Sequence, residues 1–127
     1  GQWAAKAMAG KTPVIATLDL APGITVGAQR HNGFLQGMGL ASGISATSTD
    51  LATSKEVVCA QDTHGDQTEG QTAMENCLSK NADINLVYTI NEPAASQPDF
   101  LPVSASFHST PRIWRTRRGH PVGLIAM

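Results

Sequence analysis

The sequence predicts an α/β fold in which a short parallel sheet lies between two layers of helices. Three observations predict it. Segments typical of helices and of strands alternate through the first 95 residues, the connections between them are short, and strand-like runs such as Ile84 to Ile90 are apolar enough to be buried. The 127 residues suffice for one domain, and 41% apolar residues suffice for a core.

The chain opens with a short helix and a strand. Residues 2–9 (QWAAKAMA) favour a helix that stops at Gly10, and Pro13 to Leu20 (PVIATLDL) read as the first strand. A turn through Ala21-Pro22-Gly23 follows.

Thr25 is predicted to cap a second helix that runs to about Met38. Its predicted inward stripe consists of four apolar residues, Val26, Phe34, Leu35 and Met38. Glycines inside a helix cost about 1 kcal/mol each relative to Ala, so those in this helix indicate close packing. These glycines are Gly27, Gly33 and Gly37.

The second half of the alternating region repeats the pattern. A small, polar stretch over 41–55 is predicted to be loop, and Glu56 to Gln61 is a second strand. Asp66 and Glu69 resemble a capping box for a helix that ends at Ser79 or Lys80. The third strand covers 84–90, which completes the order expected for right-handed parallel crossovers.

Polar residues follow the third strand at once, in the run Asn91-Glu92-Pro93. Pro93 suits the first turn of a helix. Ligands bind at the carboxyl ends of strands in open α/β sheets, so Asn91 and Glu92 indicate a ligand site.

The pattern changes after Ala95. Only Ser96 to Asp99 separate it from the next apolar run, Phe100 to Phe107, which is too short a link for a parallel crossover. That run is therefore predicted to pair antiparallel or to lie at an edge. The run 121–127 is predicted to be a further edge strand or an oligomer contact. The fold class is thus α/β with an irregular or β-forming C-terminal segment over 96–127.

The charged residues are also distributed differently before and after this part of the chain. The first 99 residues carry five basic and ten acidic side chains, whereas the last 28 carry four arginines and no acid. These arginines, Arg112, Arg115, Arg117 and Arg118, favour a solvated or disordered tail over a nucleic-acid contact. The uneven charge also suggests that 96–127 has a different origin from the rest, such as an alternative reading frame or a fusion.

The two cysteines show no zinc-ligand spacing. Cys59 falls in a predicted strand and Cys77 near the end of the helix that follows. They either form a bridge in an oxidising compartment or are two small buried side chains. No metal site and no cofactor are predicted from the sequence.

Five segments in residues 1–95 resemble periplasmic sugar-binding proteins of ABC importers, the type 1 family, nearest to its ribose- and fructose-binding branch. The segments are GQWAAKAM, PVIATLDLAPGITV, QRHNGF, VVCAQDTHGDQTEGQTAMENCL and INLVYTINEPAA, in family order and spacing. The resemblance implies a Rossmann-like three-layer lobe, with sugar held in a cleft between two such lobes. It covers about three quarters of the chain and leaves 96–127 unmatched.

The resemblance also implies the residues of the sugar site. Arg30, in the motif completed by Gly33 and Phe34, and Asn91 are the implied hydrogen-bonding residues, and the loop 62–66 lines the cleft. Arginine offers a planar fork of donors and asparagine both a donor and an acceptor, which match sugar hydroxyls. The expected sugar-binding residues are Arg30, Asn91, Thr25, His64 and Asp62, and no catalytic residue is expected.

The implied function is that of a truncated solute receptor that binds a pentose or hexose weakly, because the partner lobe and the later sugar ligands are not matched. The implied compartment is the periplasm, although no signal peptide is visible, and the implied partners are a sugar and the membrane subunits of an importer. A truncated sheet exposes an edge, so a homo-oligomer that uses 100–107 or 121–127 is expected.

Two alternative functions stay open. One is a small esterase-like hydrolase whose site would use the serines and histidines of the tail, Ser104, Ser106, His108 and His120. The other is an oligomerising or nucleic-acid-binding module that uses the arginines of the tail. His64 with Asp62 and Asp66 is read as a polar loop before a helix more readily than as a metal site or base.

Overall fold

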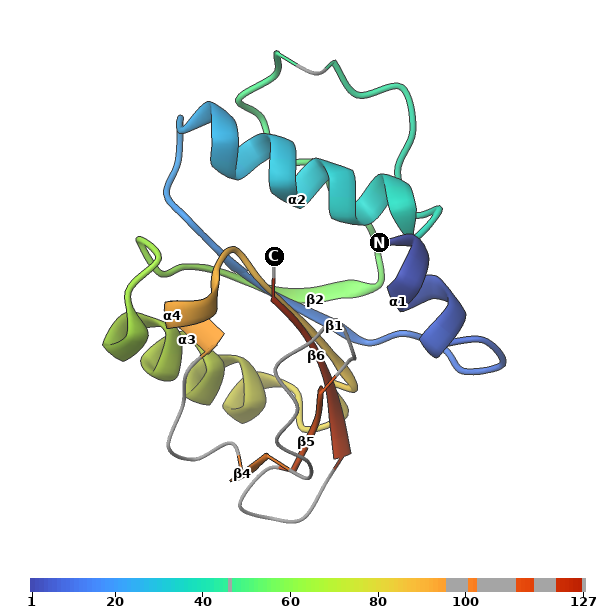
Figure 1. Cartoon of the computed structure of the whole chain (residues 1–127), viewed down its shortest axis with the longest axis vertical. Coiled ribbons are helices and arrows are strands. Elements are labelled where there is room, and N and C mark those ends of the chain that lie inside the picture. The colour runs from blue at the N-terminus through green and yellow to red at the C-terminus, as the bar shows by residue number, and fades with distance from the viewer. Residues whose placement is uncertain (46, 96–100, 103–111, 116–120, 127) are drawn as a thin grey trace.

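A computed structural model describes residues 1–45, 47–95, 101–102, 112–115 and 121–126 (Figure 1). The elements follow the predicted order through the first 95 residues. They are α1 (Gln2–Ala7), β1 (Ile15–Asp19), α2 (Thr25–Gly37), β2 (Val57–Asp62), α3 (Gln67–Lys80), β3 (Leu86–Thr89), α4 (Glu92–Ala95), β4 (Leu101–Pro102), β5 (Arg112–Arg115) and β6 (Pro121–Ala126).

The strands form one sheet in the order β2-β1-β3-β6-β5-β4. The first three strands are parallel to one another, with Ile15 of β1 opposite both Val57 of β2 and Leu86 of β3. β6 adds to β3 in parallel, and β5 then pairs antiparallel with both β6 and β4. The parallel α/β architecture predicted from the sequence is therefore confirmed.

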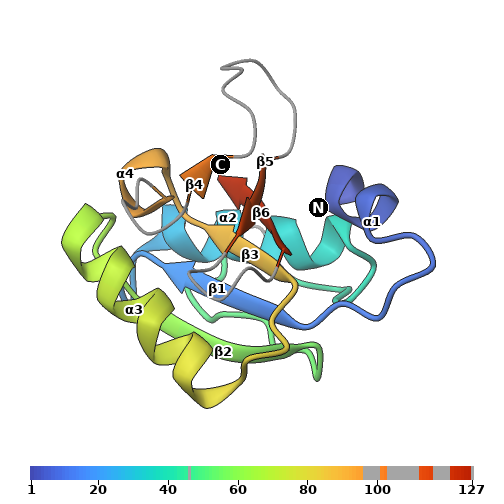
Figure 2. The same cartoon turned by 90° about the horizontal axis from the view of Figure 1, so that it is seen from below.

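Helices cover both faces of the sheet, with α1 and α2 on one side and α3 and α4 on the other (Figures 1 and 2). The core beneath α1 and α2 centres on Phe34 and Leu35 of α2 against Tyr88 and Ile90. The core beneath α3 centres on Met74 and Cys77 against Ala16, Leu18 and Val87. Successive residues of β1 point to opposite faces, so this central strand is buried along its whole length. The arrangement is compatible with a Rossmann-like fold.

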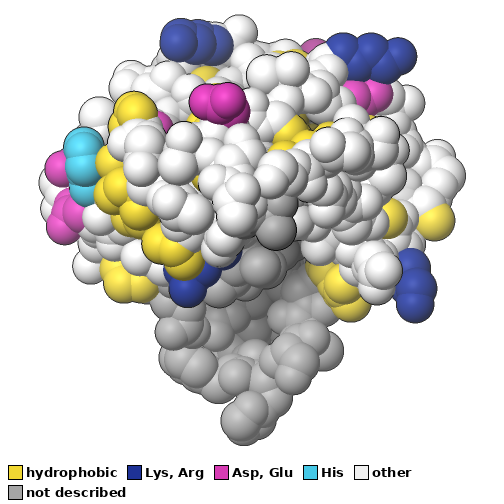
Figure 3. Space-filling model, turned by 90° about the horizontal axis from the view of Figure 1, so that it is seen from above, with side chains coloured by type: hydrophobic (Ala, Val, Ile, Leu, Met, Phe, Trp, Pro, Cys, Tyr) yellow, Lys and Arg dark blue, Asp and Glu magenta, His cyan; other side chains and the backbone are white. Residues whose placement is uncertain are grey.

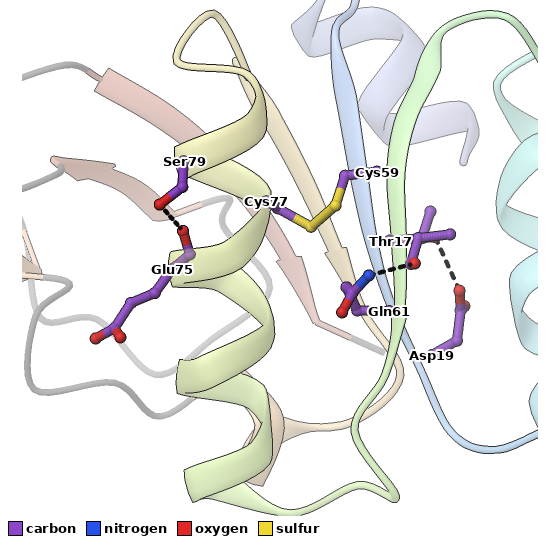
Figure 4. Close-up of a disulfide and its surroundings, with 8 residues drawn as sticks. Thr17, Asp19, Cys59, Gln61, Glu75, Cys77 and Ser79 are labelled. Atoms are coloured by element: carbon purple, nitrogen blue, oxygen red, sulfur yellow. Dashed lines mark hydrogen bonds between the residues drawn. A yellow bond between two sulfur atoms is a disulfide. The ribbon is translucent and has the colours of Figure 1, made fainter.

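A disulfide joins Cys59 of β2 to Cys77 of α3, and Figure 4 shows it on the α3 side of the sheet. The Cα atoms lie 5.6 Å apart, within the usual range for bridged cysteines. Of the two alternatives left by the sequence, the bridge is therefore the one that the structure contains.

The two predicted helix caps have different outcomes. Asp66 is the N-cap of α3, and its carboxylate accepts hydrogen bonds from the backbone N–H groups of Thr68 and Glu69. Thr25, in contrast, is the first helical residue of α2. Its predecessor Ile24 is the N-cap, with no side-chain cap, so the prediction that Thr25 caps this helix is wrong.

The predicted inward stripe of α2 is wrong at Val26, whose side chain is 46% exposed. The buried face is made instead by Gly27, Ala28, His31, Asn32, Phe34 and Leu35. Close packing holds for two of the three glycines: a Cβ on Gly37 would lie 2.8 Å from Gly1 Cα, and one on Gly27 would lie 3.1 Å from Leu20 Cβ. A Cβ on Gly33 would meet nothing within 4 Å.

The C-terminal strands correct two expectations and confirm one. β4 pairs antiparallel and lies at the sheet edge, as predicted for the run that begins at Phe100. β6 is flanked by β3 and β5, so it is not the edge strand that was expected over 121–127. Arg112 and Arg115 belong to β5, so the alternative of a disordered run is wrong at that point. Arg117 and Arg118 lie outside the described residues.

Candidate functional site

The carboxyl ends of β1, β2 and β3 meet at one edge of the sheet, where α/β proteins bind ligands. Asp19 at the end of β1 is in register with Asp62 at the end of β2. The backbone of the loop that follows β2 bonds to the end of β1, with Thr63 N 2.8 Å from Asp19 O and His64 N 2.7 Å from Leu20 O. The 62–66 loop is therefore held against the central strand.

Asn91 fixes the end of β3 to that same loop. Its amide Nδ2 donates to the carbonyl of Gly65 over 3.2 Å, and its Oδ1 accepts from the backbone N–H of Ala94 over 3.1 Å. Gly65 has a φ of +72°, and a Cβ added to it would lie 2.5 Å from Asn91 Nδ2. Because a side chain would displace Asn91, glycine is required at position 65.

Arg30 reaches the same point from α2. Its Nη1 donates to the carbonyl of Ile90 over 3.3 Å, one residue before Asn91. The Arg30 residue is exposed, whereas Asn91 is half-buried. The structure thus brings the Arg30 side chain to the backbone at the end of β3, one residue before Asn91, the other residue implied by the resemblance to hydrogen-bond the sugar.

Three further predicted site residues occupy different surroundings. Thr25 is exposed at the start of α2. His64 is exposed and adopts a positive φ of 50°, and its Nδ1 lies 2.5 Å from Oε2 of Glu69. This hydrogen bond, with the charge of Glu69 and a smaller effect of Asp62, raises the pKa of His64 above its ordinary value. Because Glu69 meets His64, the reciprocal half of the predicted capping box is not formed.

Asp62 lines a shallow depression of about 840 Å³ beside β2. Its walls are Ala60 to Asp62 on one side and Thr49 to Leu51 on the other, with Asp19 and the Pro22-Gly23 turn between them. Neither Arg30 nor Asn91 lines this depression. The structure therefore places Asp62 on the β2 side of β1 and the Arg30–Asn91 pair on the β3 side.

Figure 3 shows the exposed surface over the α2 side of the molecule. A histidine lies beside acidic side chains at one margin of this face, and a patch of apolar side chains lies next to them (Figure 3). Ile24 and Val26 are among the large apolar residues exposed in the described chain, at 41% and 46%.

Sequence reasoning missed a buried polar network centred on Asp19, which is 3% exposed. Its Oδ1 lies 2.7 Å from Nδ1 of His31, and its Oδ2 accepts from the hydroxyl of Thr17 over 2.8 Å. Figure 4 shows Thr17 and Asp19 on the opposite side of the strands from the disulfide. Polar residues do not register in a search for apolar stripes. The helical spacing of His31 from Gly27, Phe34 and Leu35 is the signal that would have placed it on the buried face.

Tyr88 packs against this network. Its ring stacks on Phe34 with centroids 4.6 Å apart and meets the His31 ring edge-on at 6.3 Å. Its hydroxyl is the buried side-chain polar atom that has no hydrogen-bond partner within the described part of the chain. Burial of the Tyr88 hydroxyl and the negative charge of Asp19 both raise the pKa of Tyr88. The positive charge of Arg30 lowers it by less, so the pKa lies above its ordinary value.

The described residues contain no group of three or more His, Cys, Asp or Glu side chains that could hold a metal ion. They also contain no helix with the length and apolar character needed to span a membrane. The serines and histidines of the alternative hydrolase, Ser104, Ser106, His108 and His120, lie outside the described residues.

Comparison of the chain with protein-family models, with curated proteins and with solved structures gives no match.

Proposed function

We propose that residues 1–95 form a sugar-binding lobe of the type found in periplasmic receptors of ABC importers, and that Arg30 and Asn91 hold the sugar. The observation that carries this proposal is the hydrogen bond from Arg30 to the carbonyl of Ile90, which brings the Arg30 side chain to the end of β3, one residue before Asn91. Both residues are those that the resemblance implies for hydrogen bonding to the sugar.

The chemistry of the pair suits a polyol. A guanidinium presents a planar fork of N–H donors, of which one bonds Ile90 within the described residues. The amide of Asn91 keeps a further N–H and a further lone pair beyond its bonds to Gly65 and Ala94. Donors and an acceptor of these kinds can bond the ring hydroxyls of a pentose or hexose.

Exposure of Arg30 sets the expected affinity. A sugar lying on this pair is contacted from one side, and each hydrogen bond contributes about 1 kcal/mol net. A few such bonds correspond to a Kd of about 1 mM or weaker. The disulfide between Cys59 and Cys77 supports an oxidising compartment, such as the periplasm, in which such receptors work.

The test is an NMR titration of the ¹⁵N-labelled protein with D-ribose and D-fructose. Saturable shifts are expected at the backbone amides of Gly65 and Asn91. Arg30→Ala should abolish them and Arg30→Lys should weaken them, because lysine keeps the charge but lacks the fork. Gln36→Ala, an exposed change further along the same helix, is the matched control and should bind as the parent does.

The outcome that removes the proposal is the absence of any saturable shift with pentoses or hexoses up to about 100 mM, a concentration that would populate even weak complexes. Equal binding by the Arg30→Ala variant would reject the assigned site while leaving sugar binding in place.

A further inference from the structure

His31 lies fully inside the protein with both ring nitrogens engaged. The residue is 2% exposed, with Nδ1 2.7 Å from the carboxylate of Asp19 and Nε2 3.0 Å from the backbone carbonyl of Ala52. A carbonyl oxygen only accepts hydrogen bonds, so Nε2 must carry a proton. The remaining question is whether a proton also lies between Nδ1 and Asp19, and which of the two groups carries it.

A neutral His31 with a bare Nδ1 would face an ionised carboxylate, which is repulsive. The contact therefore requires a second proton on the pair, held either by Nδ1 as an imidazolium or by Asp19 as a carboxylic acid. Imidazole is the stronger base by more than two pKa units in water, about 6.5 against about 3.9. In addition, Oδ2 of Asp19 accepts from Thr17, which favours the carboxylate form. The proton thus belongs on His31.

The groups around the pair oppose its loss of that proton. Thr17 faces it from β1, Tyr88 from β3 and the carbonyl of Ala52 from the loop before β2. The charged side chains on the elements packed against the pair are Asp62 of β2, in register with Asp19, Asp50 of the loop before β2, which lines the same depression as Asp19, and Arg30, which precedes His31 on α2. Deprotonation would leave a net negative charge in a site from which water is excluded, and this is costly. Burial disfavours the imidazolium, but the bond and charge of Asp19 with the Ala52 carbonyl outweigh it and raise the pKa of His31.

The pair also holds a piece of the surface in place. We define the 50–52 segment as Asp50 to Ala52, part of the loop between α2 and β2. His31 bonds the carbonyl of Ala52, and its neighbour Asn32 bonds the segment twice, from Nδ2 to Asp50 O over 2.9 Å and at Oδ1 from Ala52 N over 2.7 Å. Asp50 and Leu51 form a wall of the depression beside β2, and Asp19 lines the same depression.

We propose that Asp19 and His31 together keep one proton more than their separate side chains would hold at neutral pH, and that this ion pair clamps the 50–52 segment over the sheet. Loss of the proton removes the donor that faces Asp19, turns or displaces the His31 ring, and frees the carbonyl of Ala52. The position of the 50–52 segment therefore depends on the protonation of His31, the side chain that this segment covers. The proposal is independent of sugar binding.

The test is a ¹H–¹⁵N correlation of the imidazole nitrogens in histidine-labelled protein across pH 6 to 10, with amide hydrogen exchange of Ala52 measured alongside. Both nitrogens of His31 are expected to show the protonated signature at pH 7.5, where an unperturbed histidine is mostly neutral. Exchange of the Ala52 amide, corrected for base catalysis, should accelerate by about tenfold for each pKa unit by which closure of the 50–52 segment raises the pKa of His31.

Two variants separate the clamp from a purely structural contact. In Asp19→Asn the carboxylate is lost, so His31 should be a neutral imidazole at pH 7.5. If that variant does not fold, His31→Gln keeps a donor for the Ala52 carbonyl but cannot titrate, and the pH dependence of Ala52 exchange should disappear. His64→Gln removes an exposed histidine and should change neither readout.

A neutral tautomer of His31 in the parent protein at pH 7.5 would overturn the proposal. So would corrected Ala52 exchange that stays constant while His31 titrates, because the proton and the segment would then be uncoupled.

Discussion

Reduction of the disulfide between Cys59 and Cys77 is expected to lower the free energy of unfolding by about 3 kcal/mol at 25 °C. The two cysteines are 18 residues apart, and the loss of loop-closure entropy for a ring of that size gives this value. The perturbation is best made in the parent chain with a reducing agent, because both sulfurs then stay in the core. Cys59 is 6% exposed and Cys77 is fully buried, so cutting the bond removes the cross-link with little change in packing.

The ring closed by this disulfide contains the end of β2, the 62–66 loop and most of α3. Its effect should therefore be largest on the unfolded chain and small on the folded site. Three samples separate these contributions: the oxidised protein, the reduced protein, and the double variant Cys59→Ala/Cys77→Ala, which also loses the buried sulfurs.

The assay is urea unfolding followed by circular dichroism. With a dependence on urea of about 1–3 kcal/mol/M, reduction should lower the midpoint of unfolding by about 1–3 M. A reduced protein that unfolds within about 0.5 kcal/mol of the oxidised one would refute the reasoning, since it would show that the ring is already restricted in the unfolded state.

Three further changes test the packing and the caps in the same urea assay. Tyr88→Phe removes a buried hydroxyl that has no partner in the described chain, so it should be neutral or stabilise by up to about 2 kcal/mol; a loss above about 1 kcal/mol would mean that a water holds this hydroxyl. Gly70→Ala places a Cβ 2.5 Å from the carbonyl oxygen of Ala94 and should destabilise by about 1–3 kcal/mol as α3 and α4 separate. Its control is Gly33→Ala, on the open side of α2, which should raise the free energy of unfolding by up to about 1 kcal/mol. Equal changes in stability at the two glycines would contradict the close contact of α3 with α4. Asp66→Ala removes the N-cap of α3 and should cost about 1 kcal/mol, whereas Asp66→Asn keeps an acceptor and should cost less; equal losses would assign the effect to charge alone.

Local patterns predicted the elements of the first 95 residues well because β1 and β3 are buried along their whole length and most connections are short. β3 spans Leu86–Thr89 within the predicted 84–90, and α3 spans Gln67–Lys80 after the predicted cap at Asp66. Thr25 was wrong as a cap because an N-cap residue must also have extended backbone, and here Ile24 has it. A hydroxyl near the start of a helix does not by itself fix where the first turn begins.

The tail shows how long-range pairing escapes local reasoning. The short link after Ala95 correctly predicted that β4 would pair antiparallel and lie at the edge. The error at β6 came from counting residues only to the next apolar run. The chain from Thr89 to Pro121 is long enough for a parallel crossover, so β6 can lie beside β3.

The buried face of α2 was the part of the core least predictable from the sequence. A hydrophobic stripe gives no weight to His31 or Asn32, although both are buried. They are inside because Asp19 and the 50–52 segment supply partners that compensate for the water they lose. Those partners are 12 to 21 residues away in sequence, so the compensation exists only once the chain is folded.

Asn91 shows how a site residue can serve the fold and a ligand at once. Its amide joins β3 to the 62–66 loop through Gly65 and begins α4 through Ala94, so it is already oriented before any ligand arrives. An amide held by two backbone groups loses little side-chain freedom when a hydroxyl binds to its remaining donor or acceptor. Asn91→Ala should therefore weaken both the loop and a bound sugar, whereas Arg30→Ala removes from the fold only the bond to the carbonyl of Ile90 and should act mainly on the sugar.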